Sequence, residues 1–310
     1  MDLSRPLRPV PGPSLRPWAG SRLGEGVGET WVAGPSSAVQ LGADPARTLD
    51  ELAAEAGEAL VGSAGMAMLG PRFPLLAKLI DAAEWLSLQV HPDDGLAREL
   101  YGPGAVGKDE AWVVLAAAAA TRVVVGPARS LGASEAMALV TGGAMGLEAC
   151  EVRTVLPGDT LNVRAGTIHA IGPGAFVFEL EQPSDVTFRI SDWGRPPTPE
   201  RRLHLGEAGR AVDPRLRAEV AGTGWRLVGG ALNERRLRLE LVTTGSAALR
   251  RPAGRSPEIV TAVGGSVALL GAGFEERLAA LETALLPAAV DACEIVLGDG
   301  ALAVVGSLPL

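Results

Sequence analysis

Lysine is scarce in this 310-residue chain: Lys78 and Lys108 are the only two among its 28 basic residues. Histidine is nearly as scarce, with three residues. Two of them, His91 and His169, lie in short segments that carry other polar side chains, whereas His204, after Arg201–Leu203, is expected to be exposed and unrelated to them. An ammonium is a compact point charge, which the planar guanidinium of arginine does not reproduce. We therefore expect both lysines to lie at positions that require a compact charge. The segments that contain these lysines and the two histidines are candidates for the functional site.

Cysteine and long apolar runs are also lacking. Cys150 and Cys293 form no CxxC pair and are too few for a disulfide framework, which is typical of a reducing compartment. The longest apolar run, Ala111 to Ala120, is far shorter than the roughly 20 residues that cross a membrane. The net charge of -8 argues against a nucleic acid or an anionic membrane as partner. We expect a soluble cytoplasmic protein, monomeric or alternatively dimeric, whose anionic substrate would need a local cationic pocket.

The 40 glycines and 23 prolines divide the chain into short segments, many of them with period-2 patterning, which indicates a mainly β fold. Helices are expected at Asp44–Gly62, Gly95–Tyr101 and Gly132–Val140. After about Asn233 the pattern is of strands alone, expected at Leu237–Thr243, Glu258–Leu270, Leu281–Ala288, Ala292–Leu297 and Leu302–Val305. We expect one domain over residues 1–235, with helical segments near 44–62 and 95–148, and a second β-domain over residues 236–310, which contains no histidine and is expected to lack a metal site.

Three strand-like segments carry the residues that could do chemistry. In a strand through Leu86–Pro92, the side chains of Ser87, Gln89 and His91 would share one face. A strand that begins at Lys108 would likewise send Lys108 and Glu110 to one side. A polar residue on an outer strand face is usually just solvated, so no single member of this set is informative.

A third segment makes the polar residues of the first two segments informative when they are taken together. It starts at the turn Pro157–Asp159 and ends at Gly166–His169, and together with the upstream histidine it forms the two-part pattern of cupin barrels, in which inward-facing side chains bind a divalent metal.

At greater length, the chain resembles the type I mannose-6-phosphate isomerases, zinc-dependent enzymes of the cupin superfamily. The resemblance implies a cupin (jelly-roll) barrel with a helical insertion, followed by a second, smaller β-barrel-like domain. Six blocks in register carry it: RPWAGSRLGE from Arg16, GETW from Gly28, FPLLAKLIDAAEWLSLQVHPDD from Phe73, GKDEAWVVL from Gly107, PGDTLNVRAGTIHAIG from Pro157 and SDVTFRISDWGR from Ser184.

The resemblance also implies roles for residues of this chain. It implies one Zn²⁺ per chain, with the ligands Gln89, His91, Glu110 and His169. Glutamine is an unusual zinc ligand, so the identity of the metal depends mainly on the family. Further residues are implied around the same cavity: Lys78, Lys108, Ser87 and Arg189 for substrate binding, and Arg189, Glu179 and Lys108 for catalysis.

The implied reaction is the interconversion of mannose 6-phosphate and fructose 6-phosphate by proton transfer between C1 and C2 through an enediolate. Glu179 is the candidate base, and a lysine or a metal-bound water remains an alternative. Two other classes stay open for a cupin: an oxygenase or sugar epimerase, and a sugar-binding protein without catalysis. The scarcity of histidine counts against an oxygenase, and the presence of Lys78, Lys108, Glu179 and Arg189 together counts against a non-catalytic protein.

Overall fold

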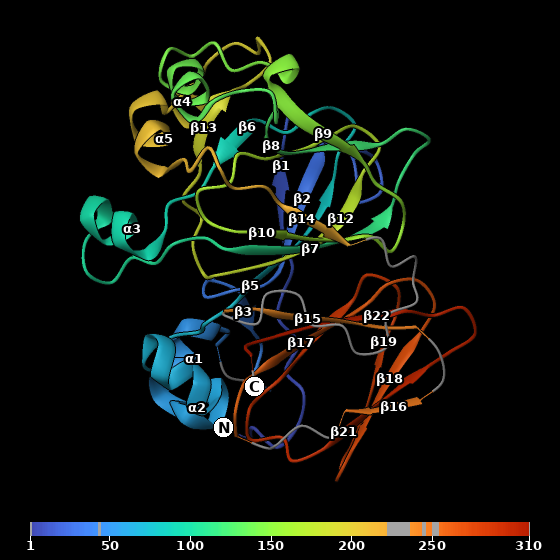
Figure 1. The fold of residues 1–310 in the computed structure, drawn as a ribbon. Helices are drawn as coiled ribbons and strands as arrows, with labels where there is room; N and C mark the ends of the chain where they lie inside the picture. The colour runs from blue at the N-terminus through green and yellow to red at the C-terminus, as the bar shows by residue number, and fades with distance from the viewer. Residues whose placement is uncertain (1, 43–44, 222–235, 244–245, 250–253, 310) are drawn as a thin grey trace. The chain divides into compact units, whose positions relative to one another are not determined.

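The computed structural model describes residues 2–42, 45–221, 236–243, 246–249 and 254–309. Strands predominate (Figure 1), which confirms the mainly β prediction. The chain forms two compact units: unit 1 comprises Met1–Pro13, Thr30–Leu79 and Trp225–Leu310, and unit 2 comprises Ser14–Glu29 and Ile80–Gly224. No helix in the described part of the chain is long and apolar enough to cross a membrane.

Unit 2 is built on antiparallel strands. The largest sheet has the order β1 (Gly12–Leu15), β2 (Val27–Ala33), β5 (Leu76–Asp81), β12 (Phe176–Glu181), β7 (Glu110–Ala116), β10 (Thr160–Val163) and β14 (Glu219–Ala221), of which β1, β2 and β5 run on into unit 1. Two smaller sheets are β11 (Ala170–Ile171), β8 (Arg122–Pro127) and β9 (Cys150–Thr154), and β13 (Phe188–Ser191) with β6 (Leu88–Val90).

Two apolar cores support these strands. One contains Trp112, Leu161 and Val177, which β7, β10 and β12 direct to a common side. The other joins Leu88, Val90 and Phe188 to the helices, in the order α3 (Asp94–Tyr101), α4 (Ala133–Thr141) and α5 (Leu205–Ala211), with short 3₁₀ helices at Leu147–Ala149 and Pro199–Arg201. Helices α4 and α5 lie side by side next to β13 (Figure 1).

The segment that contains α3 leaves the strands of unit 2 after β6 and returns to them before β7 at almost the same place. It begins after His91, and the backbone N–H of Lys108 donates to the carbonyl oxygen of Pro92 at 3.1 Å. The N–H of Gly107 donates to Asp94 Oδ1 at 2.8 Å. A Cβ at Gly107 would lie 2.7 Å from the backbone of Asp93 and Asp94, so only glycine allows this closure.

Unit 1 holds two four-stranded antiparallel sheets around a shared apolar core. Their orders are β15 (Arg238–Val242), β22 (Ala303–Ser307), β17 (Glu258–Ala262) and β20 (Thr283–Leu286), and β16 (Ser246–Leu249), β21 (Cys293–Leu297), β18 (Val267–Gly271) and β19 (Phe274–Leu278). The single strand expected at Glu258–Leu270 is wrong, because Gly264 and Gly265 have φ of 80° and 64° and form a turn within it. Whether these sheets form a separate barrel-like domain stays a prediction.

Unit 1 also contains the N-terminal helices α1 (Leu49–Ala56) and α2 (Glu58–Leu69), and the short pair β3 (Ala38–Val39) and β4 (Arg47–Thr48). Thr48 begins α1 with a capping box, in which its hydroxyl accepts from Glu51 N and the Glu51 carboxylate accepts from Thr48 N. Asp44, where the helix was expected to begin, lies outside the described residues.

The division into units differs from the expected one. Residues 1–13 and 30–79 group with the C-terminal strands because backbone hydrogen bonds join them, from Leu7 to Leu285 and from Ala288 to Leu60. The expected boundary at residue 235 ends a segment, 222–235, that lies outside the described residues. That residues 1–235 and 236–310 are folding domains stays a prediction, as does the absence of metal from the second.

The single helix expected to end at Gly62 is two helices, which are divided at Gly57. The second continues to Leu69 with a kink at Gly62, whose φ is 74° and ψ is 168°. The kink frees the N–H groups of Ser63 and Ala64 from the helix, and they donate to the carbonyl oxygens of Gly254 and Arg255 at 2.7 and 2.9 Å. A Cβ at Gly62 would run into the backbone of Arg255.

We predict that Gly62→Ala lowers the free energy of unfolding by about 3 kcal/mol, because it adds a backbone clash to the cost of a left-handed conformation. The matched control is Gly57→Ala, since Gly57 has φ of 51° and ψ of -126° but open space around its Cβ position, and we expect it to lose about 2 kcal/mol from backbone strain alone. Urea denaturation of both variants measures the difference. Equal losses would mean that the close approach to Arg255 contributes nothing.

Candidate metal centre

Two rows of paired residues in unit 2 bring the predicted site residues together. In the first row, Gln89 on β6 pairs with Arg189 on β13 and forms an isolated bridge with His169, in which each backbone N–H donates to the other carbonyl at 3.0 Å. In the second row, Glu110 on β7 pairs with Glu181 on β12. Directly opposite residues of antiparallel strands project to the same face, so each row presents its side chains together.

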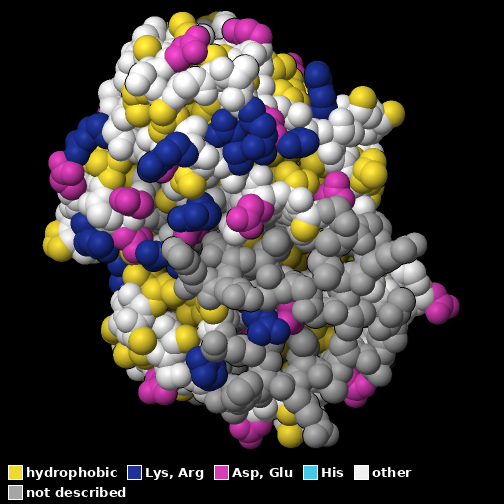
Figure 2. Space-filling model, viewed as in Figure 1, with side chains coloured by type: hydrophobic (Ala, Val, Ile, Leu, Met, Phe, Trp, Pro, Cys, Tyr) yellow, Lys and Arg dark blue, Asp and Glu magenta, His cyan; other side chains and the backbone are white. Residues whose placement is uncertain are grey.

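The positions of His91 and His169 are fixed by backbone around them. The Gly166 N–H donates to the His91 carbonyl at 2.9 Å, and Gly166 itself has φ of 87°, which suits glycine in the turn before His169. Both imidazoles are 1% exposed. No histidine is visible on the face shown in Figure 2, in accordance with this burial.

The tautomers of the two histidines follow from their partners. His91 Nδ1 lies 2.8 Å from the Val186 carbonyl oxygen, and His169 Nδ1 lies 2.9 Å from the Thr167 carbonyl oxygen. A carbonyl oxygen can only accept, so both Nδ1 atoms carry the proton and both Nε2 atoms present a lone pair. Metal-binding histidines are held in this way, with the outer ring nitrogen bonded to a backbone carbonyl or carboxylate.

These lone pairs point at a carboxylate. His91 Nε2 lies 2.9 Å from Glu110 Oε1, and His169 Nε2 lies 3.6 Å from Glu110 Oε2. Burial lowers the pKa of His91 to about 4 and also lowers the pKa of His169, so both rings are neutral at pH 7. Two acceptors therefore face one another at 2.9 Å without a proton between them, an arrangement that a cation would stabilise.

Gln89 completes the ring of donor atoms. Its side-chain amide lies 3.1 Å from His169 Nε2 and 3.0 Å from Ser87 Oγ. Amide nitrogen and oxygen are interchangeable in shape, and a reversed amide would direct Oε1 to the same centre while its NH₂ donates to Ser87. Tetrahedral ligands at 2.0–2.1 Å from zinc are about 3.3 Å apart. The observed separations of 2.9, 3.1 and 3.6 Å bracket this spacing.

The charge of the cluster also fits a divalent ion. One ligand-type atom from each of Glu110, Glu179 and Glu181 lies within 4.8 Å of the others, and all three residues are buried. Lys108 Nζ lies 2.8 Å from Glu110 Oε1 and from Glu181 Oε2. Three carboxylates and one ammonium leave a net charge of -2 beside two neutral imidazoles, and a divalent cation would neutralise it.

The electrostatics of Glu110 and Lys108 reflect this proximity. Burial alone would raise the pKa of Glu110, but the Lys108 ammonium outweighs it and holds the pKa well below its usual value. Burial alone would lower the pKa of Lys108, but the surrounding carboxylates hold it well above its usual value. The Trp112 indole donates to Glu110 Oε2 at 3.1 Å and fixes the orientation of the carboxylate. Glu110 is thus an anion with both oxygens engaged.

Arg189 belongs to the same region of unit 2. Its side chain is 9% exposed, its NH1 donates to the Arg202 carbonyl at 3.0 Å, and its Nε has no hydrogen-bond partner among the described residues. Burial and the positive charges of Arg201 and Arg16 lower the pKa of Arg189, and Asp192 opposes this. A bound anion would relieve the repulsion among these guanidinium groups.

The third histidine corrects one expectation. We expected His204 to be exposed and unrelated to the pocket, but it is half-buried against Phe188, and its Nδ1 accepts from the Arg189 backbone N–H at 3.1 Å. The reason is the fold of the segment before α5, which the His204 N–H ties to the Arg189 carbonyl at 2.8 Å. His204 therefore supports the backbone of Arg189 and is absent from the histidine–carboxylate cluster.

Lys78 lies on the part of β5 that belongs to unit 1. It is 3% exposed, and its Nζ is 5.0 Å from the centre of the Trp31 ring, a cation–π geometry. Its assignment to the substrate pocket stays a prediction.

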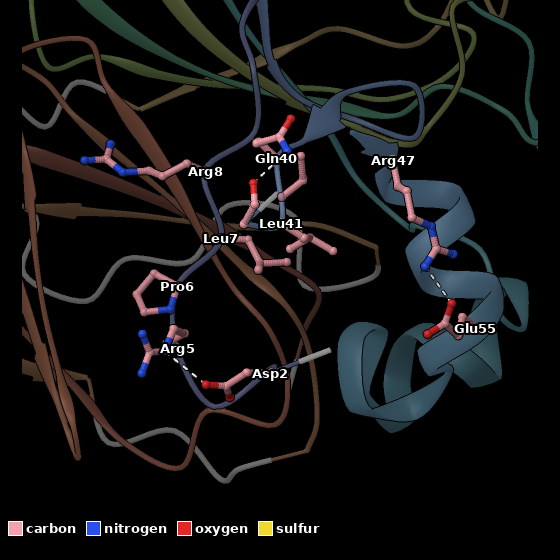
Figure 3. Close-up of a pocket in the computed structure, with 11 residues that line it drawn as sticks. Asp2, Arg5, Pro6, Leu7, Arg8, Gln40, Leu41, Arg47 and Glu55 are labelled. Carbon is pink, nitrogen blue, oxygen red and sulfur yellow. Dashed lines mark hydrogen bonds and ion pairs between the residues drawn. The ribbon is translucent and has the colours of Figure 1, made fainter. Parts of the chain in front are cut away.

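Unit 1 also has a cavity of about 510 Å³, lined by residues such as Arg8, Gln40 and Arg47 (Figure 3). Its arginines are engaged by carboxylates: Arg5 with Asp2 at 3.1 Å, Arg8 with Glu276 at 2.8 Å and Arg47 with Glu55 at 2.6 Å. The positive charge of this cavity is thus already balanced.

Comparison with known proteins agrees with the geometry. Residues 21–107, which include Gln89 and His91, match the family model described as phosphomannose isomerase type I, catalytic domain. The mannose-6-phosphate isomerase of Streptococcus mutans is 34% identical over 206 residues, 62% of this chain and 62% of that protein. The "Probable mannose-6-phosphate isomerase GmuF" of Bacillus subtilis is 32% identical over 221 residues, 66% of this chain and 68% of that protein. The chain belongs to the type I phosphomannose isomerase family.

The alignments leave about a third of each of these two relatives unmatched. Solved structures of the family cover more of the chain. The mannose 6-phosphate isomerase of Bacillus subtilis has a TM-score of 0.78 at 26% identity and covers 97% of this chain and 99% of its own. A phosphomannose isomerase of Salmonella typhimurium, at 16% identity and a TM-score of 0.70, shares the fold over 98% of this chain and 100% of its own. The cupin-type fold of the family is therefore confirmed.

The phosphomannose isomerase resemblance missed two residues of the cluster. Glu181 is fully buried and bonded to Lys108, and Trp112 orients Glu110. The alternation of Phe176–Glu181 places Glu179 and Glu181 on one face, so the same signal that selected Glu179 applied to Glu181. Nothing in the sequence indicates that Trp112 would turn its N–H toward Glu110.

We predict that His169→Ala raises the dissociation constant for Zn²⁺ about 100-fold or more, since loss of a direct ligand should cost more than the 10- to 100-fold typical of outer residues. Elemental analysis after dialysis and chelator competition measure it. The control is His204→Ala, which lies outside the cluster and should keep full metal content. Retention of stoichiometric zinc by His169→Ala would contradict the ligand assignment.

Proposed function

We propose that this protein is a metal-dependent aldose–ketose isomerase that interconverts mannose 6-phosphate and fructose 6-phosphate. Family membership supports the reaction, and one structural observation carries the proposal. The lone pairs of His91 and His169 converge on Glu110 in a buried cluster that also contains a further carboxylate, Glu179, and an ammonium, Lys108. A binding protein without catalysis would have no need for these last two groups so close to the ligand atoms.

The proposed metal is one Zn²⁺, held by Gln89, His91, Glu110 and His169. When bound, it would act as a Lewis acid that polarises a substrate oxygen and stabilises negative charge developing there. The identity of the metal follows the family, because a glutamine ligand by itself does not favour zinc. The cluster contains only two histidines, which counts against an oxygenase, and membership of the isomerase family counts against an epimerase.

Glu179 is proposed to move the proton. The open-chain sugar must lose a proton at one of C1 and C2 and regain it at the other, and a single carboxylate above the enediolate plane can do both. Glu179 is 4% exposed on β12, and one of its carboxylate oxygens lies within 4.8 Å of ligand-type atoms of Glu110 and Glu181. Lys108 would offset the negative charge of the enediolate oxygens.

Arg189 is proposed to bind an oxyanion of the substrate, either the phosphate or the enediolate. The guanidinium is already held by the Arg202 carbonyl, which orients the planar fork. Ser87 is proposed to contribute to the same substrate site, and the role of Lys78 in substrate binding stays a prediction. A cytoplasmic location and a monomeric or dimeric state stay predictions.

We predict that the purified chain converts mannose 6-phosphate to fructose 6-phosphate, that dialysis against a chelator abolishes turnover, and that Zn²⁺ restores it, because the cluster requires a divalent ion to polarise the substrate. A coupled assay of fructose 6-phosphate measures the rate. Fructose 6-phosphate as substrate serves as the reverse control. Absence of turnover in both directions with stoichiometric zinc bound would overturn the proposed reaction.

We predict that Arg189→Lys lowers kcat/KM by roughly 10- to 100-fold, which corresponds to the loss of about 1.5–3 kcal/mol from a charge-assisted hydrogen bond. Zinc content should not change, because Arg189 is not a ligand. The control is Arg129→Lys, since Arg129 is an exposed arginine paired with Glu151 at 2.9 Å, and its kinetics should equal those of the unsubstituted protein. Unchanged kinetics in Arg189→Lys would show that the guanidinium fork has no part in turnover.

A further inference from the structure

Glu181 has no role in the proposed ligand set or proton transfer, yet it is one of the most enclosed charged residues of unit 2. It is 0% exposed, at the end of β12, and the strand register places it directly opposite Glu110. Side chains at such positions share a face. Two buried carboxylates side by side repel one another unless a cation lies between them.

That cation is Lys108. Its Nζ is 2.8 Å from Glu181 Oε2 and equally 2.8 Å from Glu110 Oε1. The backbone also places it, since the Lys108 N–H is bonded to the Pro92 carbonyl. One ammonium is therefore shared by one carboxylate that belongs to the ligand set and one that does not.

The oxygen of Glu110 that contacts Lys108 is the same oxygen that faces His91 Nε2, at 2.9 Å. A metal ion that binds between Glu110 and His91 competes with Lys108 for this oxygen. An ammonium left in a buried site without a partner carries a penalty of several kcal/mol. When a metal ion occupies Glu110, the Glu181 carboxylate would still be available to pair with the Lys108 ammonium.

We propose that Glu181 is a positioning residue that acts through Lys108: it retains the ammonium next to the metal centre when Glu110 passes to the metal, and so directs Lys108 toward the substrate oxygens. The part of this inference that concerns turnover rests on the proposed isomerase function. The part that concerns metal binding does not. Glu181 neither ligates the metal nor touches the substrate.

The first experiment measures metal binding alone, with Co²⁺ and a competing chelator. Glu181→Gln preserves the size of the side chain and one acceptor oxygen but removes the charge. We expect it to raise the dissociation constant for Co²⁺ about tenfold, the lower end of the effect of outer residues on metal affinity. Glu240→Gln, which removes a buried carboxylate paired with Arg238 in unit 1, is the matched control and should not change affinity. Equal Co²⁺ affinity in Glu181→Gln and the unsubstituted protein overturns the proposal.

The second experiment is a double-mutant cycle on kcat and KM with Lys108→Met. Positioning through Lys108 predicts that Glu181→Gln lowers kcat about tenfold with little change in KM, and that it has less than about a twofold further effect when Lys108 is already methionine. A loss of the same size in both backgrounds would mean that Glu181 acts without Lys108 and overturns the proposal.

Glu181→Asp keeps the charge but withdraws the carboxylate by one methylene, and it replaces Glu181→Gln in the cycle if the glutamine variant does not fold. We expect a smaller loss of kcat, again confined to the background that retains Lys108. If the unsubstituted protein has no isomerase activity, the proposed function fails, and the Co²⁺ measurement still decides whether Glu181 supports the metal centre.

Discussion

The site depends on one unfavourable contact, the approach of two hydrogen-bond acceptors to 2.9 Å at His91 Nε2 and Glu110 Oε1. In water such atoms would separate or take a proton between them. Here the proton is excluded, because the Val186 carbonyl fixes the imidazole tautomer and burial lowers the pKa of His91 to about 4. The fold therefore maintains an arrangement that a cation between the two acceptors would stabilise.

The surrounding residues resist relaxation of that contact. Trp112 holds the second oxygen of Glu110, the Thr167 carbonyl holds His169, and Lys108 supplies positive charge at the same carboxylate without occupying the space between the acceptors. The strands that carry the cluster are packed in two apolar cores, with Leu88, Val90 and Phe188 in one and Trp112 and Leu161 in the other. The polar cluster is thus enclosed by packing that fixes its strands, and the low dielectric strengthens each interaction within it.

The sequence predicts those site residues that alternate along a strand or that match a family pattern. Alternation placed Ser87, Gln89 and His91 on one face and Lys108 with Glu110 on another, the cupin pattern added His169, and the family resemblance joined these residues into one ligand set. Long-range pairing is not encoded in any such local pattern. Glu181 was therefore overlooked although it alternates with Glu179, and the hydrogen bond from Arg189 to His204 was not expected. From the local sequence, Gly62 predicts the end of a helix. The helix resumes after it because the Ser63 and Ala64 N–H groups bond to the carbonyl oxygens of Gly254 and Arg255, which are distant in sequence.

The closure at Pro92 and Lys108 has a consequence for how this protein family can vary. Because the two residues are bonded across the base of the α3 segment, His91 and Lys108 keep their separation whatever the intervening chain does. The side of α3 that packs against the core of Leu88 and Val90 is constrained. The exposed residues of the excursion are free to change, and with them the surface it presents, without disturbing the chemistry at its root.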